Sequence, residues 1–248
     1  MQLNTFLDYL NNSPESNLLI DGLLSNLFYG DQGLQIQITE LFKFLIDVFH
    51  DRKTEILEIF YTRILPQMSQ HFAKLEKNEY FYSFVQQYIE ILTHCIRFHG
   101  YRIRQHITHN KLLLQIYQGF EINEKSVELA IIRLVKAIIT SKDTVLIKHI
   151  IHNSLLDPIF EIYLKNAKKN NLLDSACLDL FESMRKENNE NMNIHFLRRY
   201  KRKIEEYGLQ KYFKKLLDRY EHLNVLSENE IQDENENFPD VERHIIAQ

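Results

Sequence analysis

Apolar residues recur along nearly the whole chain at the three- and four-residue spacing of amphipathic helices. No segment alternates apolar and polar residues for long enough to predict a strand. The pattern therefore predicts an all-α protein. The predicted helices span residues 3–11, 15–29, 34–50, 53–73, 79–98, 101–107, 110–119, 124–140, 143–152, 157–168, 171–187, 190–206 and 208–223.

The helix predicted at 171–187 has the clearest boundaries. Asparagine pairs, which favour turns, stand on both sides of it, at 170–171 and at 188–189. Its apolar face consists of Leu172, Leu173, Ala176, Cys177, Leu180, Phe181 and Met184.

Prolines mark three further positions. Ser13-Pro14 and Asp157-Pro158 each have the form of an N-cap residue followed by proline in the first helical turn. Pro66 falls inside the helix predicted at 53–73, where it should kink or split the helix.

The chain contains an internal repeat. Residues 105–113 match residues 148–156 at an offset of 43. A looser third copy of the inner helix, at an offset of 45, aligns residues 176–184 with residues 131–139. The first offset also superposes Ile91, Leu92, Cys95 and Ile96 on Leu134, Val135, Ile138 and Ile139. A period of ~40–47 residues is typical of armadillo and HEAT arrays. Since each unit contains a short, a middle and a long inner helix, we expect a right-handed armadillo-like helical-repeat solenoid of about five repeats.

Composition agrees with helices joined by short polar turns, because the 248 residues include only 6 Gly, 4 Pro and no Trp. Formal charge is −4, but residues 224–248 hold seven acids and one base. The remainder is nearly neutral and lacks the overall charge of a nucleic-acid binder. We therefore expect a repeat domain at 1–226 and an acidic disordered tail at 227–248.

Two cysteines, Cys95 and Cys177, are too few for a disulfide framework. Both lie on apolar helix faces, so we expect small buried side chains and a reducing compartment. The N-terminus has no basic leader and is not expected to be a signal peptide. The longest apolar run, 129–139, contains two bases and is far shorter than the ~20 residues that span a bilayer.

Catalytic and metal chemistry find little support. Histidines cluster at 94–109, and His149 and His152 are three residues apart, a spacing that can place two imidazoles on one helix face. No Cys, Asp or Glu lies at ligand spacing, and His106 and His109 are repeat-equivalent to His149 and His152. We expect these histidines to form hydrogen bonds between repeat helices or to cap them. Gly-x-Ser-x-Gly and Gly-rich phosphate loops are absent, so we predict a non-enzyme without cofactor or metal.

The strongest basic cluster lies near the end of the repeat region. Its members are Arg198, Arg199, Lys201, Arg202 and Lys203. Two interpretations stay open: a patch for nuclear localisation or for an acidic partner, or the solvated face of terminal helices.

Several strings resemble one family of helical-repeat proteins. They are Lys53–Tyr61 with Leu65-Pro66, His94–Ile103 with Asn110–Leu113, Leu155–Ile159, and Asn171–Ala176 with Leu180–Glu182 and Arg185–Glu187. Their order and spacing, from about residue 18 to 223, resemble the SMEK/Falafel/Psy2 family, the regulatory subunit 3 proteins of protein phosphatase 4. The resemblance covers the C-terminal part of that family's conserved helical region. The family's pleckstrin-homology/EVH1-like domain has no counterpart, so the chain is expected to be a fragment or a reduced homologue.

The resemblance implies a non-catalytic regulatory and scaffolding subunit that tethers the phosphatase 4 catalytic subunit and its companion regulatory subunit to phosphoprotein substrates. It also implies a location in the nucleus and cytoplasm. Two alternatives stay open. One is a karyopherin-like armadillo adaptor for extended peptides, which the absence of Trp disfavours, and the other is a nucleic-acid scaffold acting through the basic cluster.

Overall fold

The computed structural model describes residues 16–47 and 53–218. Within these ranges the regular elements are all helical. They are α2 (Ser16–Tyr29), α3 (Gln32–Asp47), α4 (Lys53–Ile59), the π-helix η1 (Phe60–Ile64), α5 (Leu65–Phe72), α6 (Glu79–Phe98), α7 (Tyr101–His109), α8 (Leu112–Gln118), the 3₁₀ helix η2 (Gly119–Ile122), α9 (Lys125–Thr140), α10 (Thr144–His152), α11 (Asp157–Asn166), α12 (Leu172–Glu187) and α13 (Glu190–Glu206). Residues 210–218 are also helical.

The chain divides into two compact units, residues 1–183 and 184–248, with the boundary inside α12. The predicted single domain over 1–226 therefore stays a prediction. The expected helix at 3–11, the Ser13-Pro14 cap and the acidic tail at 227–248 lie outside the described residues.

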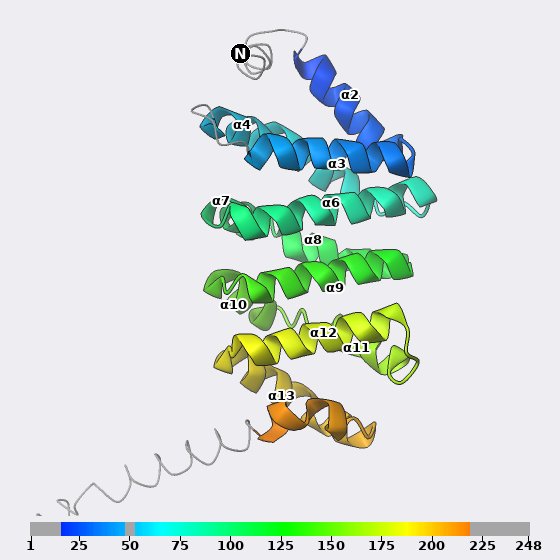
Figure 1. Ribbon diagram of the computed structural model, residues 1–248, viewed down its shortest axis with the longest axis vertical. Helices are drawn as coiled ribbons and strands as arrows, with labels where there is room; N and C mark the ends of the chain where they lie inside the picture. The colour runs from blue at the N-terminus through cyan, green and yellow to red at the C-terminus, as the bar shows by residue number, and fades with distance from the viewer. Residues whose placement is uncertain (1–15, 48–52, 219–248) are drawn as a thin grey trace, which may run out of the picture. The chain divides into compact units, whose positions relative to one another are not determined.

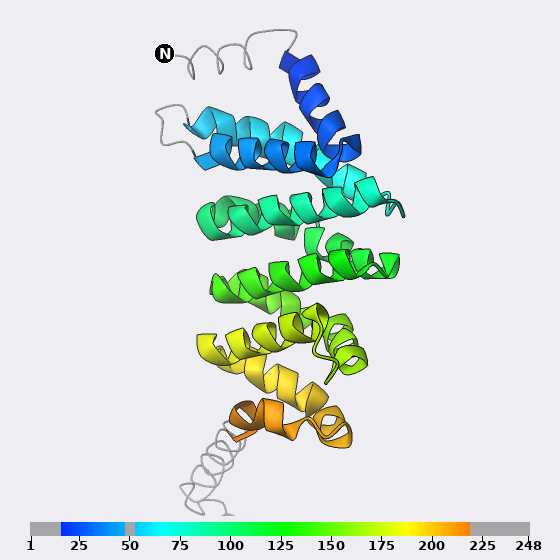
Figure 2. The ribbon, with the colours of Figure 1, turned by 45° about the vertical axis from the view of Figure 1, so that its right-hand side comes forward.

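Unit 1 is built from successive helical layers. Its longest described helix, α6, packs against α3 on one side and α9 on the other. Figures 1 and 2 show α3, α6, α9 and α12 as roughly parallel helices, one after another. Leu92 and Cys95 of α6, and Val135 and Ile138 of α9, are fully buried. One layer cannot bury its apolar stripe alone, so stacking produces the core.

The repeat of 43 residues is confirmed in the backbone. α7 and α10 begin and end 43 residues apart. Asn110 Nδ2 donates to His106 O at 3.0 Å, and Asn153 Nδ2 donates to His149 O at 2.8 Å. The next residues, Lys111 and Ser154, both have positive φ, 51° and 52°. Matching turns after matching helices bear out the predicted armadillo-like array.

Pro66 splits its helix, as predicted. The π-helix η1 lies between α4 and α5, and the Leu65 N–H donates to the Phe60 carbonyl, five residues back. Proline has no N–H, and its ring would collide with the carbonyl four residues earlier, that of Thr62. The wider π turn relieves that collision and keeps the chain helical.

The N-cap predicted at Asp157 is wrong by one residue. α11 already includes Asp157, and Leu156 is the N-cap with helical φ and ψ of −82° and −15°. The Asp157 N–H donates to Ser154 O at 3.0 Å, which extends the preceding turn into the helix. The N-cap position is therefore held by Leu156, which makes no side-chain cap hydrogen bond. Pro158 still occupies the first helical turn, where its missing N–H costs nothing.

Unit 2 contains α13 and the helical residues 210–218. The Asn189 side chain caps α13 by accepting the Met192 N–H at 3.0 Å. Phe196 and Phe213 bring the two helices together, with ring centroids 5.7 Å apart. No helix in the described ranges has the length and apolarity to cross a membrane.

Candidate partner-binding surfaces

The five bases of the predicted cluster all lie on α13. Arg198, Arg199 and Arg202 are exposed, whereas Lys201 and Lys203 are half-buried. The Arg202 Nε donates to Glu206 Oε1 at 2.8 Å, one turn along the helix. At 3.6 residues per turn the bases spread over about 200° of the helix surface. They therefore surround the polar side of α13 and do not form one compact patch.

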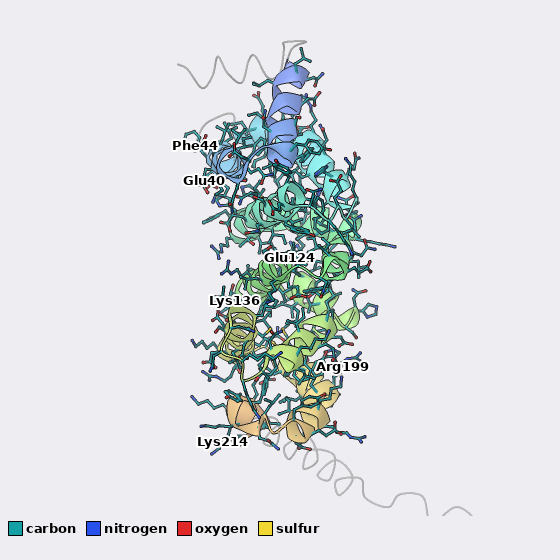
Figure 3. The ribbon with its side chains drawn as sticks, turned by 90° about the vertical axis from the view of Figure 1, so that its right-hand side faces the viewer. Glu40, Phe44, Glu124, Lys136, Arg199 and Lys214 are labelled. Atoms are coloured by element: carbon teal, nitrogen blue, oxygen red, sulfur yellow. The ribbon has the colours of Figure 1, made fainter. Side chains whose placement is uncertain are left out.

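The second half of this basic region lies on residues 210–218. Lys211, Lys214 and Lys215 are exposed there. Figure 3 shows Arg199 and Lys214 at different sides of unit 2. An acidic partner that contacted both groups of bases would have to wrap around the unit.

In unit 1, charged side chains link one layer to the next. Lys43 Nζ of α3 lies 3.4 Å from Glu90 Oε1 of α6 and 2.6 Å from Glu40 Oε1. Lys136 Nζ of α9 lies 2.5 Å from Asp179 Oδ2 of α12. Figure 3 shows Glu40 and Lys136 on the same side of unit 1, together with the exposed Phe44. Each of these partly exposed ion pairs contributes at most about 1 kcal/mol to the free energy of unfolding. Their main effect is on which surface charges remain unpaired.

A polar trough runs between α6 and α9 on this unit. It has a volume of about 430 Å³ and continues into a second hollow of about 330 Å³, with Arg97, Ala137 and Thr140 lining both. Its charged lining residues are Glu90, Arg97, Arg133, Lys136 and Asp179. Sequence reasoning missed this surface. The one available signal was that Lys136 and Asp179 are opposite charges separated by the repeat period.

The histidines have structural contacts. His94 Nε2 lies 2.9 Å from Asp47 Oδ1 on the neighbouring helix α3. His99, the C-cap of α6, shares a hydrogen bond of 2.9 Å between its Nδ1 and the Tyr61 hydroxyl. Both contacts join separate helices. Only the His99 contact is a hydrogen bond of the kind expected, since His94 Nε2 has no hydrogen-bond partner of adequate geometry in the described ranges. Burial lowers the pKa values of the repeat-equivalent His106 and His149, which favours their neutral forms.

Cys95 and Cys177 are fully buried, as predicted. Burial raises the pKa of each thiol to about 12. A thiol with that pKa is almost entirely protonated at neutral pH and is a poor nucleophile. Across residues 16–47 and 53–218, no group of three or more His, Cys, Asp or Glu side chains could hold a metal ion.

Stacked helices that repeat every 43 residues define an armadillo-like helical-repeat protein. Proteins of this class work by presenting surface to partners. A family model described as "Phosphatase 4 regulatory subunit 3" matches residues 3–222. The chain belongs to this family.

Relatives from three organisms are similar to the chain. Suppressor of Mek1 of Dictyostelium discoideum is 27% identical over 235 residues, which covers 85% of this chain and 22% of the relative. Serine/threonine-protein phosphatase 4 regulatory subunit 3 of Drosophila melanogaster is 25% identical over 214 residues, which covers 83% of this chain and 22% of the relative. Protein PPP4R3C1 of Mus musculus is 30% identical over 133 residues, which covers 54% of this chain and 16% of the relative.

The chain thus spans about a fifth of the length of these curated relatives. No solved structure matches it significantly.

Proposed function

We propose that the chain is a regulatory and scaffolding part of a protein phosphatase 4 complex. The family match over residues 3–222 carries this proposal, because it covers nearly the whole helical region. The helical array supports it physically, since stacked repeats offer an extended surface to several partners at once. Tethering phosphatase and substrate to one array would raise their effective concentration for each other.

On this proposal the partners are the phosphatase 4 catalytic subunit, its companion regulatory subunit and phosphoprotein substrates, and the chain itself is non-catalytic. The exposed bases of α13, Arg198 and Arg202 among them, serve as a contact for an acidic partner or as a nuclear-localisation element. The proposed location is the nucleus and cytoplasm.

Affinity capture of the tagged chain from its native cells tests the proposal. We expect mass spectrometry to recover the phosphatase 4 catalytic subunit, and we expect the purified chain alone to hydrolyse no phosphate ester. Capture of importins without any phosphatase would favour the karyopherin-like alternative. Hydrolysis by the chain, with contaminating phosphatase excluded, would contradict the non-catalytic role.

Nucleic-acid binding through the basic cluster of α13 is a second candidate, favoured by the exposed Arg198, Arg199 and Arg202. It requires affinity for DNA or RNA that falls steeply as salt rises, because bases that neutralise phosphates release counterions. A filter-binding titration at two salt concentrations measures this. Absent or salt-insensitive binding would remove the candidate.

A further inference from the structure

The trough is lined mainly by α6 and α9, which form its two walls. Four of its lining residues have small side chains: Thr93, Ser126, Ala130 and Ala137. Longer side chains also line it, with Gln86, Gln87 and Arg97 on α6 and Arg133 and Lys136 on α9. Small lining side chains permit close approach of another backbone, as small residues do at helix interfaces.

The charges of the trough do not balance. Its two acids already have basic partners, since Glu90 pairs with Lys43 and Asp179 pairs with Lys136. Arg97 and Arg133 are exposed, and neither forms an ion pair or hydrogen bond with any residue in the described ranges. Two guanidinium groups are therefore available in one trough. Guanidinium groups pair with carboxylates through two parallel hydrogen bonds.

The trough also suits an extended main chain. From Ser126 to Thr140 helix α9 runs about 21 Å along the trough, at ~1.5 Å per residue. An extended peptide advances ~3.3 Å per residue, so about six residues would fit along it. Gln86 and Gln87 on the opposite wall each offer an amide donor and an acceptor, which can satisfy the backbone N–H and C=O groups of an extended chain.

We propose that this trough binds an extended peptide segment rich in Glu or Asp on a partner protein. The Arg97 and Arg133 guanidinium groups take two of its carboxylates, and the glutamines contact its backbone. This inference goes beyond the proposed role in the phosphatase complex and holds whether or not the partner that carries the segment is the phosphatase.

Fluorescence anisotropy with the purified chain tests the proposal. The probe is a labelled peptide of about twelve residues that alternates glutamate and serine, twice the length that fits the trough. The decisive variant is the double charge reversal Arg97→Glu, Arg133→Glu. Its matched control is Lys148→Glu, Lys165→Glu, which makes the same charge change at exposed bases of α10 and α11 outside the trough. Circular dichroism checks that both variants keep the helical fold.

We expect saturable binding to the unmodified chain and to the control, and about tenfold or greater weakening in the Arg97→Glu, Arg133→Glu variant. A peptide with glutamine in place of glutamate should not bind. Equal weakening in the control would mean that net charge alone attracts the peptide, and no binding to the unmodified chain would remove the site. Binding of a phosphoserine peptide without binding of the glutamate peptide would overturn the carboxylate assignment. Because phosphatase capture is measured separately, failure here leaves the proposed function intact.

Discussion

At the residue scale, His71 of α5 lies in surroundings that do not match its polarity. The residue is 3% exposed, and its ring stacks on Phe28, with centroids 4.1 Å apart and planes 12° from parallel. Phe84 contacts it edge-on at 4.8 Å. Neither ring nitrogen has a hydrogen-bond partner in the described ranges. Burial, assisted by the positive charge of Lys74, lowers the pKa of His71 to about 4.

This low pKa makes stability depend on pH. In the unfolded chain a histidine has a pKa of ~6.5. Between pH 6.5 and 4 the unfolded state binds more protons at this site, so the free energy of unfolding falls as pH falls. The contribution of neutral His71 to the free energy of unfolding is complete above pH 6.5. Below pH 6.5 this contribution decreases by up to about 1.4 kcal/mol per pH unit. Urea unfolding at pH 7.5 and pH 5 measures the difference.

The substitution His71→Phe should remove this part of the pH dependence and raise stability at pH 5, because phenylalanine fits the aromatic cluster and leaves no unpaired nitrogen. His152→Phe, at an exposed position, is the control and should retain the loss at pH 5. If His71→Phe loses as much stability between pH 7.5 and pH 5 as the unmodified chain, the proposed cause is wrong. Histidines at 106 and 149 leave a residual dependence in every variant.

At the element scale, short polar side chains determine where helices begin. Asn78 caps α6 by accepting the Phe81 N–H at 2.8 Å. Asn171 accepts the Asp174 N–H at 2.9 Å at the start of α12. Asp143 caps α10 through Oδ1, which accepts the N–H groups of Val145 at 3.0 Å and Leu146 at 3.1 Å. Such caps hold backbone donors that have no partner inside the helix.

Asp143 combines a cap with an ion pair, and the two can be separated. Its Oδ2 lies 3.4 Å from Arg104 Nη1, so the residue also joins α10 to α7. Asp143→Ala should lower the free energy of unfolding by about 1–2 kcal/mol, most of it from the lost cap. Asp143→Asn keeps the cap and removes the charge, so it should cost at most about 1 kcal/mol. Urea unfolding measures both losses of free energy from the shift of the midpoint, provided that the dependence of the unfolding free energy on urea concentration stays the same in both variants. Equal losses would show that the ion pair, and not the cap, matters here.

Helix positions could be predicted from the sequence because hydrophobic periodicity and Asn or Asp caps are local signals. For that reason α12, predicted at 171–187, is found at Leu172–Glu187. The cap at Asp157 failed because Leu156 keeps helical dihedrals and the preceding turn merges into α11. That Pro66 disturbs its helix was predictable, but the π geometry that absorbs it depends on how η1 packs. The aromatic surroundings of His71 come from α2, α5 and α6 together, and no local pattern contains them.

At the scale of the whole molecule, the repeat of 43 residues explains what was predictable from the sequence. Apolar positions that recur at this offset become the buried faces of α6 and α9. The trough depends instead on which charges are already paired across layers. Lys43 with Glu90 and Lys136 with Asp179 become partners only when the layers stack. Sequence periodicity cannot show that Arg97 and Arg133 have no carboxylate partner among residues 16–47 and 53–218.

The predicted basic cluster on α13 is less compact in three dimensions than in the sequence. The run at 198–203 is compact in sequence, yet a helix distributes consecutive residues around its axis. Tyr200, inside the run, is buried on the opposite side. The sequence shows which residues carry the charge. Because the five bases spread over about 200° around the axis of α13, they do not all face in one direction.

Direct complex formation tests the central claim most directly. The purified chain is mixed with purified phosphatase 4 catalytic subunit, with and without the companion regulatory subunit, and analysed by size-exclusion chromatography with light scattering. We predict a stable complex that contains this chain, with all phosphatase activity residing in the catalytic subunit. Separate elution of the chain under both conditions, while it remains helical by circular dichroism, would contradict a scaffolding role in this complex.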